Sequence, residues 1–232
     1  MNNIIAFAGL KNAGKDSSAD MLIYMLNTPK FMHSYTMYKL LGVVKGKWKK
    51  TSFAKPLKQV LSIMLNIPVE KFEDREFKER CYINFNTLEL KFECELKQED
   101  KLSDNQFNKL IKTECYEKII NSWISIRQVM QYVGTQVLRK FISDDVWINA
   151  TITKDIVISD LRFKREFDTI KQKNGLLIYV NRPGCVPGNH ASEREVYELY
   201  QQNKFEYILE NNGDLKDLFY KIKDGISKTI CS

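Results

Sequence analysis

The chain has 232 residues, of which 44% are hydrophobic, and it carries a formal net charge of +7. This length suits one α/β domain with a large core and an insertion, whereas two full domains would be cramped. The five cysteines are odd in number and show no close pairing, which fits a reduced intracellular compartment. With two histidines and no Cys-x-x-Cys motif, we expect no zinc site. No signal peptide and no apolar run of membrane-spanning length is evident, so we expect a soluble protein.

The chain opens with an apolar strand over residues 3–8 and a helix over 14–27, joined by a glycine-rich loop. Gly9, Gly14 and Lys15 have the spacing of a phosphate-binding loop, in which backbone N–H groups surround a polyphosphate and the lysine supplies a cation. Such loops continue with Ser or Thr, whose hydroxyl holds Mg²⁺, but here Asp16 comes first and Ser17 follows. We predict that phosphates contact this whole segment: Gly9, Lys11, Asn12, Ala13, Gly14, Lys15, Asp16 and Ser17.

Positive charge is concentrated in residues 21–69, which contain eight lysines and no Asp or Glu. Such a segment raises the local concentration of anionic substrates, among them nucleotides. It is equally typical of a nucleic-acid surface, with Trp48 as a stacking group, or of a solvated lysine-rich face. The sequence leaves these three interpretations open.

The middle of the chain changes character. A short strand over 51–54 and an amphipathic helix over 55–65 come first. Alternating apolar and charged residues over 82–97 predict a half-exposed strand or hairpin. We place it in a mixed α/β insertion running from about 70 to 121, closed by a helix near 104–120.

The remainder alternates helices with apolar strands. We predict the following elements: a helix over 125–141 with Ser125 as its N-cap, a short helix over 144–150, a strand over 156–159, a helix over 163–173, strands over 176–180 and 206–210, and a final helix over 214–229. Strands that are apolar throughout predict a parallel sheet covered on both faces, a three-layer α/β/α fold of the P-loop type.

Ligands of such sheets bind beyond the carboxyl ends of the strands, where Asp160, Arg162 and Arg182 follow two of the predicted strands. Asp160 is a candidate Mg²⁺ ligand; the alternative is that Asp160 or Ser159 caps the next helix. The planar guanidinium of Arg162 suits phosphate oxygens; its alternative is an i,i+4 ion pair with Glu166.

Taken together, these residues resemble the phage-type deoxynucleoside monophosphate kinases. The resemblance covers most of the chain outside about 66–121, and it rests on residues 9–20, 123–135, 147–148, 159–162 with Glu166, 182–184, 190–193 and 211–215. Asp16 after the loop lysine is also a habit of this family. Several motifs in the same order are far more specific than a phosphate loop alone.

The resemblance implies transfer of the ATP γ-phosphoryl group to a deoxynucleoside monophosphate, within deoxynucleotide biosynthesis. It implies catalytic roles for Lys15, Arg127, Arg162 and Asp160, with Mg²⁺ held by Asp16, Ser17 and Asp160. For the acceptor it implies contacts from Arg75, Arg80, Arg127, Gly134, Trp147, Asp160, Arg162 and Glu166. Close packing at Gly134, a core position for Trp147 and solvated charges at Arg75 and Arg80 are the alternatives.

The resemblance further implies a lid-like segment over about 183–203, shaped by His190 and Glu193, and a homodimer acting in the cytoplasm of a phage host. Two rival interpretations remain at this point. One is another P-loop kinase, of the dephospho-coenzyme A or phosphomevalonate type. The other is a nucleic-acid-binding protein with a regulatory nucleotide site, which intact Lys15 and Asp160 disfavour.

Overall fold

The computed structural model describes residues 3–187 and 191–226. The chain forms two compact units, one made of Met1–Phe53 with Thr151–Ser232 and the other of Ala54–Ala150. The insertion predicted over about 70–121 falls inside the second unit. The phosphate-loop segment and the strands that precede Asp160 and Arg182 belong to the first.

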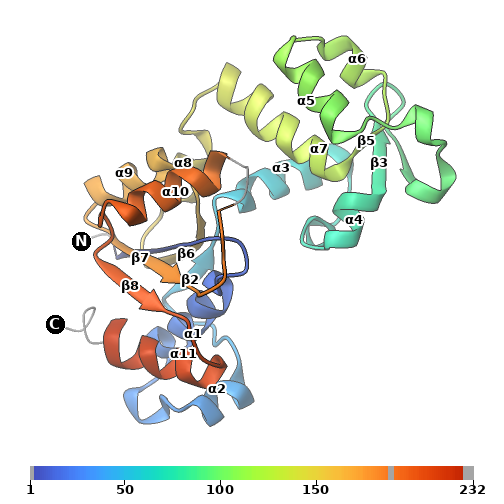
Figure 1. The fold of residues 1–232 in the computed structure, drawn as a ribbon. Coiled ribbons are helices and arrows are strands. Elements are labelled where there is room, and N and C mark those ends of the chain that lie inside the picture. The colour runs from blue at the N-terminus through green and yellow to red at the C-terminus, as the bar shows by residue number, and fades with distance from the viewer. Residues whose placement is uncertain (1–2, 188–190, 227–232) are drawn as a thin grey trace. The chain divides into compact units, whose positions relative to one another are not determined.

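A five-stranded parallel sheet forms the centre of the first unit (Figure 1). Its strand order is β2-β6-β1-β7-β8, and each neighbouring pair is parallel. The strands are β1 (Ile4–Ala8), β2 (Lys49–Thr51), β6 (Ile156–Leu161), β7 (Leu176–Asn181) and β8 (Tyr207–Glu210). All five residues of β1 are buried. The predicted α/β fold class with a parallel sheet is therefore confirmed.

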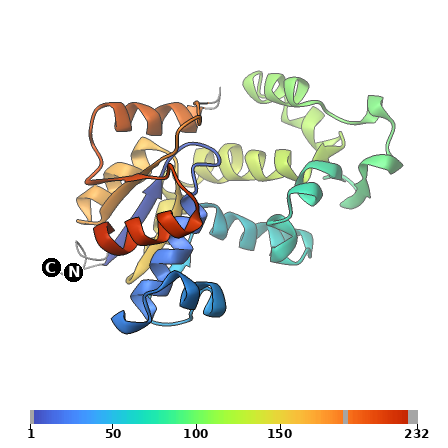
Figure 2. The ribbon, with the colours of Figure 1, turned by 60° about the horizontal axis from the view of Figure 1, so that its bottom comes forward.

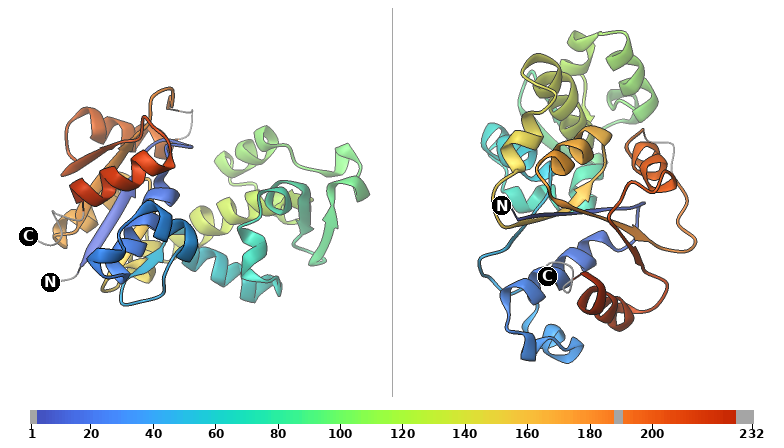
Figure 3. Two further views of the ribbon diagram at one scale, coloured as in Figure 1. Left: turned by 90° about the horizontal axis from the view of Figure 1, so that it is seen from below. Right: turned by 90° about the vertical axis from the view of Figure 1, so that its left-hand side faces the viewer.

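Helices cover both faces of this sheet, with α9 and α10 on one face and α1 and α11 on the other (Figure 1, Figure 3). Figure 2 brings α11 forward, where it lies beside α2. The bounds are α1 Lys15–Asn27, α2 Tyr35–Leu41, α9 Lys164–Gln172, α10 Ala191–Gln201 and α11 Leu215–Lys221. A 3₁₀ turn, Lys30–Met32, precedes α2, and a π-helical turn, Ile222–Ile226, continues α11.

The main core of the first unit lies between the sheet and the helices α1 and α11. Phe7 of β1, Tyr24 of α1 and Phe219 of α11 are fully buried there. The ring centroids of Tyr24 and Phe219 are 6.2 Å apart, a separation at which aromatic rings attract one another. This packing fixes α1, and with it the loop that leads from β1 into the helix.

The second unit combines short helices with a small antiparallel sheet of order β4-β3-β5. Its elements are α3 Ala54–Leu65, α4 Arg75–Arg80, β3 Cys81–Asn84, β4 Glu89–Phe92, α5 Asp104–Lys112, α6 Tyr116–Ile120, β5 Ile124–Ser125, α7 Ile126–Gln131 and α8 Val146–Thr151. The 3₁₀ turns are Val69–Phe72, Glu93–Glu95 and Gln98–Asp100, and a π-helical segment, Tyr132–Arg139, continues α7. Phe72, Phe107 and Ile119 form part of its own hydrophobic core.

Ser125 is the N-cap of α7, as predicted. Its hydroxyl oxygen accepts a hydrogen bond from the backbone N–H of Gln128 at 3.2 Å, and the Gln128 side chain accepts one from the N–H of Ser125 at 2.9 Å. This reciprocal pair satisfies two backbone donors at the start of the helix. It fixes the first turn of α7, where Arg127 lies.

Several predicted boundaries are wrong. The strand expected over 51–54 is β2, Lys49–Thr51, because its partner β6 pairs with these three residues. The helix expected near 104–120 is two helices, α5 and α6, since Glu114 between them has a φ of 55°, which a right-handed helix cannot accommodate. The segment 82–97 forms the hairpin β3–β4, which ends at Phe92. Helices α2, α4 and α10 were not predicted.

One correction bears on the candidate site. Asp160 was expected just beyond a strand ending at residue 159, but β6 continues to Leu161, so Asp160 is a strand residue. Within the described ranges, none of the helices has the length and hydropathy required to span a bilayer.

Candidate active site

The loop between β1 and α1 takes a shape that only glycine permits at two positions. Gly9 has a φ of 146° and Gly14 a φ of 99°. A Cβ atom on Gly9 would lie 2.6 Å from the carbonyl oxygen of Val180, and one on Gly14 would lie 2.5 Å from the amide nitrogen of Asn211. Both the backbone conformation and the close neighbours therefore exclude a side chain, as a loop that surrounds a phosphate requires.

The lysine of the loop folds back over it. The ammonium group of Lys15 donates to the carbonyl oxygens of Gly9 at 2.9 Å and Leu10 at 2.7 Å. The side chain thus spans the loop from its first residue to the start of α1. Lys11 and Asn12 are exposed at the tip, whereas Ala13 is buried. The predicted phosphate-contacting residues are contiguous in space as well as in sequence.

A residue near the end of the chain holds this loop. The side-chain amide of Asn211 donates to the carbonyl oxygen of Ala13 at 2.8 Å, and its own backbone N–H bonds to Asn181 at 2.7 Å. Asn211 is 5% exposed. It follows β8 directly and thereby ties the carboxyl ends of β7 and β8 to the loop. The sequence marks residues 211–215 only as a motif and does not reveal this contact.

A cavity of about 280 Å³ adjoins the loop within the first unit. The residues that line it are Gly14, Ser17, Arg182, Asn211, Gly213, Asp214, Leu215 and Leu218. Its rim carries a guanidinium and a hydroxyl, and Leu215 and Leu218 supply apolar surface. This combination suits an anionic ligand that has an apolar ring.

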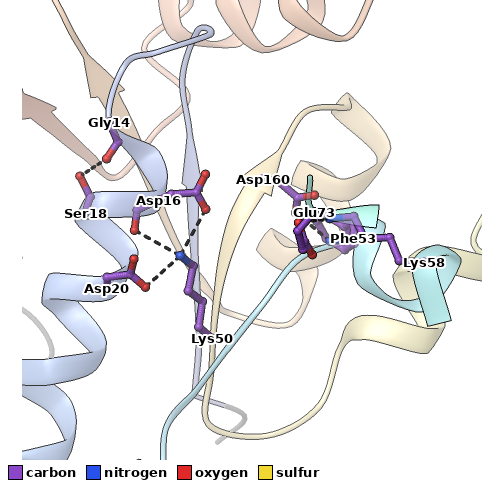
Figure 4. A network of polar contacts seen from close by, with 9 residues as sticks. All are labelled: Gly14, Asp16, Ser18, Asp20, Lys50, Phe53, Lys58, Glu73 and Asp160. Atoms are coloured by element: carbon purple, nitrogen blue, oxygen red, sulfur yellow. Dashed lines mark hydrogen bonds and ion pairs between the residues drawn. The ribbon is translucent and has the colours of Figure 1, made fainter. Parts of the chain in front are cut away.

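Asp16 is contacted by Lys50 of β2 (Figure 4). The ammonium nitrogen of Lys50 on β2 lies 3.3 Å from Asp16 Oδ1 and 2.9 Å from Asp20 Oδ1. Burial raises the pKa of the Asp16 carboxyl, but a hydrogen bond with Ser159 and the charges of Lys50 and Lys15 outweigh burial and bring the pKa below its ordinary value. The Asp16 side chain is nevertheless 77% exposed, so it is an ionised surface carboxylate that Lys50 contacts.

Asp160 joins β6 to the chain that follows β2. Its Oδ1 accepts a hydrogen bond from the backbone N–H of Phe53 at 2.7 Å (Figure 4). Asp160 comes directly after Ser159, the residue that contacts Asp16. Asp16, Ser17 and Asp160 belong to one unit and carry oxygen atoms, the donor type that Mg²⁺ takes in proteins.

Arg162 and Glu166 interact through the backbone and not through their charges. Glu166 is 2% exposed, and its Oε2 accepts the backbone N–H groups of Arg162 at 2.9 Å and Phe163 at 3.1 Å. This caps the first turn of α9, a role that the sequence assigned to Ser159 or Asp160. The guanidinium of Arg162 is exposed and makes no ion pair with any described residue.

Arginines of the second unit meet at Glu79. The guanidinium of Arg127 lies 2.9 Å from Glu79 Oε1, and that of Arg75 lies 3.3 Å from the same atom. Burial raises the pKa of Glu79, but the charges of Arg127 and Arg75 lower it by more. The pKa of Glu79 is therefore below its ordinary value. Arg80 instead pairs with Glu76 at 2.7 Å and Glu93 at 3.5 Å. Arg75 and Arg127 are therefore brought together, and Arg80 faces other carboxylates.

A buried lysine that the sequence analysis passed over lies nearby. Lys58 of α3 is 9% exposed, and its ammonium group lies 2.6 Å from Glu73 Oε2. Lys78 of α4 donates to the carbonyl oxygen of Glu73 at 3.3 Å. Burial lowers the pKa of Lys78, and the charges of Lys58 and Arg127 lower it further. Positive charge is thus concentrated here despite the two glutamates. In the sequence, Lys58 is one of the eight lysines of the basic segment 21–69, with nothing to mark it as buried.

Gly134 and Trp147 contact each other. The indole N–H of Trp147 donates to the carbonyl oxygen of Gly134 at 2.9 Å, and Trp147 is 4% exposed. A Cβ on Gly134 would lie 2.9 Å from a methyl carbon of Leu57. These contacts pack the π-helical segment Tyr132–Arg139 against α3 and α8. A role of either residue toward the acceptor stays a prediction.

The predicted lid segment is only partly visible. Residues up to 187 are described, and Gly184 has a φ of 82°, which marks the turn expected after Arg182. Helix α10 then occupies most of the predicted range 183–203. His190 and the side chain of Glu193 lie outside what the structure describes.

Comparisons with known proteins bear on the whole chain. The family model described as "Deoxynucleotide monophosphate kinase" matches residues 3–222. The deoxynucleotide monophosphate kinase of Enterobacteria phage T4 is 24% identical over 95% of this chain and 97% of its own length. A putative deoxynucleotide monophosphate kinase of Acanthamoeba polyphaga mimivirus is 30% identical over 41% of this chain, a stretch that spans 58% of that protein. A solved dephospho-CoA kinase from Campylobacter jejuni aligns with 99% of this chain at 15% identity and a TM-score of 0.36, which is too low to bear on the reaction.

Proposed function

Because the chain belongs to the deoxynucleotide monophosphate kinase family, we propose that it transfers the γ-phosphoryl group of ATP to a deoxynucleoside monophosphate, giving the diphosphate and ADP. The observation that carries this proposal is the match of the family model over residues 3–222, a range that includes the phosphate loop and the segments around Arg127, Asp160 and Asn211. The same family membership implies use of ATP.

The donor nucleotide is assigned to the first unit. The N–H groups between Gly9 and Gly14 and the ammonium group of Lys15 bind the triphosphate, which needs fixed donors more than covalent chemistry. The adjoining cavity, with Arg182 at its rim and Leu218 among its walls, takes the adenosine. Asn211 supports both, because it bonds to the loop and lines the cavity.

We assign Mg²⁺ to the same unit. The donor atoms fit a cation that keeps several waters and takes one or two protein oxygens beside the substrate phosphates. Ser17 and Asp160 supply a hydroxyl and a carboxylate, and Asp16 is a third oxygen donor that Lys50 and Ser159 already engage. When bound, the ion neutralises charge on the phosphates during transfer.

We propose that basic side chains bind the phosphate of the acceptor. In the second unit these are Arg127, Arg75 and Lys58, with Arg80 as a further candidate. In the first unit Arg162 is the corresponding group, and Glu166 holds its backbone. A planar guanidinium can bind two phosphate oxygens at once, so these arginines both orient the acceptor and stabilise charge that develops during transfer. We further propose that Gly134 and Trp147 of the second unit, and Asp160 of the first, each contribute to binding the acceptor.

An assay of ADP release with a panel of acceptors tests the proposed reaction. The panel contains the four deoxynucleoside monophosphates, dephospho-coenzyme A and phosphomevalonate, with and without DNA. We expect ADP release with at least one deoxynucleoside monophosphate and none with the other two acceptors. Turnover of dephospho-coenzyme A alone would contradict the proposal, and so would ATP binding that only DNA stimulates.

We also propose a homodimer, which sedimentation equilibrium would test.

A further inference from the structure

A negative charge stands where phosphate loops ordinarily have a neutral hydroxyl. Asp16 follows the loop lysine directly and is the second residue of α1. An ionised carboxylate in the first turn repels a polyphosphate bound to the same helix N-terminus. An aspartate carboxylate is ionised at neutral pH, so this charge is present whenever the protein meets ATP. Something in the structure must offset it.

Lys50 is the group in the right place. Its ammonium nitrogen lies 3.3 Å from the Asp16 carboxylate and 3.4 Å from the Asp16 carbonyl oxygen, and it reaches Asp20 one turn later at 2.9 Å. Its side chain is 28% exposed, so the ammonium group is partly shielded from water and from dissolved salt. The strand β2 that carries it is itself fixed by pairing with β6.

The other neighbours of Asp16 do not replace Lys50. Ser159 contributes a hydrogen bond but no charge. Lys15 lies close enough to lower the pKa of Asp16, but under the proposed function its charge is directed to the triphosphate. Lys50 is therefore the positively charged side chain that stays with Asp16 when nucleotide is bound, whether or not Mg²⁺ also contacts this carboxylate.

We propose that Lys50 is a positioning residue that neutralises and orients Asp16, and so permits an acidic residue beside the triphosphate of ATP. This inference rests on the proposed function insofar as ATP is the donor. It assigns a role to one lysine of the basic segment 21–69, for which the sequence left three interpretations open. Lys50 neutralises the negative charge of Asp16 in the first turn of α1, so that this turn can bind a phosphate.

Calorimetric titration of the full-length protein with ATP tests this without any acceptor. We expect Lys50→Met to raise the dissociation constant of ATP about tenfold, since one uncompensated charge then faces the triphosphate. Lys50→Gln should behave in the same way and serves if the methionine variant does not fold. Lys50→Arg, which keeps the charge, should remain near the parent.

The decisive variant combines Lys50→Met with Asp16→Asn. If the lysine is needed only because the aspartate is charged, removing both charges restores ATP affinity to within about threefold of the parent. A lysine that contacted the phosphates directly, or that merely stabilised the fold, would give no such recovery. The KM for the acceptor should be unchanged in all of these variants.

Lys47→Met is the matched control. Lys47 pairs with Asp155 at 3.3 Å, just before β6 begins and therefore at the end of the sheet away from the loop. ATP affinity should not change in this variant. Unchanged affinity in Lys50→Met, or no recovery in the double variant, would overturn the inference and leave the proposed function standing. If the parent bound no ATP, the proposed function would fail, and this inference with it.

Discussion

The side-chain amide of Asn211 donates a hydrogen bond to the carbonyl oxygen of Ala13 at 2.8 Å, so a residue after the last strand supports the phosphate loop at the other end of the chain. Replacing it by alanine leaves a buried carbonyl without that donor. We expect Asn211→Ala to lower the free energy of unfolding by about 1–3 kcal/mol and to raise the KM for ATP.

Urea unfolding and steady-state kinetics would measure both effects. The neighbouring Asn212 is exposed, and Asn212→Ala is the control; it should change the free energy of unfolding by less than about 0.5 kcal/mol. Equal stability of the two variants would mean that the loop does not depend on Asn211.

The ammonium group of Lys15 donates to the loop carbonyl oxygens of Gly9 and Leu10. We expect Lys15→Ala to reduce turnover by at least about a hundredfold, because a fixed cation at the transferred phosphates is lost. The melting temperature should stay near that of the parent. Activity within tenfold of the parent would contradict the assignment of the phosphate loop.

Magnesium titrations separate the two residues that follow Lys15. Asp16 is engaged by Lys50, whereas Ser17 is one of the residues that line the cavity beside the loop. We therefore expect Ser17→Ala to raise the Mg²⁺ concentration needed for half-maximal activity more than Asp16→Asn does. The opposite order would assign the metal to Asp16 and remove Ser17 from the site.

We expect lysine at position 127 or 162 not to support turnover. An arginine that stabilises charge in phosphoryl transfer contributes on the order of 10³–10⁵ in rate, and a point charge does not reproduce its planar fork. An exposed ion pair, such as that of Arg127 with Glu79, contributes at most about 1 kcal/mol of stability. Arg127→Lys and Arg162→Lys should thus lose turnover and keep their melting temperature.

The exposed Arg165 of α9 provides a control for Arg162, and Arg165→Lys should retain activity. Near-parental kinetics for both Arg127→Lys and Arg162→Lys would return these arginines to structural roles. Such a result would also weaken the proposed reaction.

Lys58 and Glu73 form a pair that can be separated by mutation. If Lys58 binds the acceptor phosphate, Lys58→Met raises the KM for the deoxynucleoside monophosphate about tenfold or more, since a charge-assisted contact is lost, and leaves the KM for ATP unchanged. Glu73→Gln removes the same ion pair but keeps the lysine, so acceptor KM should be unchanged or lower. An equal rise of the acceptor KM in both variants would show that the ion pair supports the structure and that Lys58 does not bind the acceptor.

Much of this protein follows from local patterns in its sequence. Gly9, Gly14 and Lys15 identify the phosphate loop, because two glycines with positive φ and a following helix are needed within a few residues of one another. Apolar strands that alternate with helices predict the parallel sheet. Helices cover both faces of such a sheet, so both faces of each strand carry apolar side chains. Ser125 marks the start of α7, because its cap involves residues three positions apart.

Tertiary structure decided the partners of the candidate site residues. Lys50 reaches Asp16 across 34 positions of the chain, Asp160 reaches Phe53 across 107, and Asn211 reaches Ala13 across 198. Each of these contacts forms because parallel strands bring their ends to the same edge of the sheet. No pattern of neighbouring residues encodes such a meeting. The same reason explains β2, whose bounds depend on its register with β6 and not on its own residues.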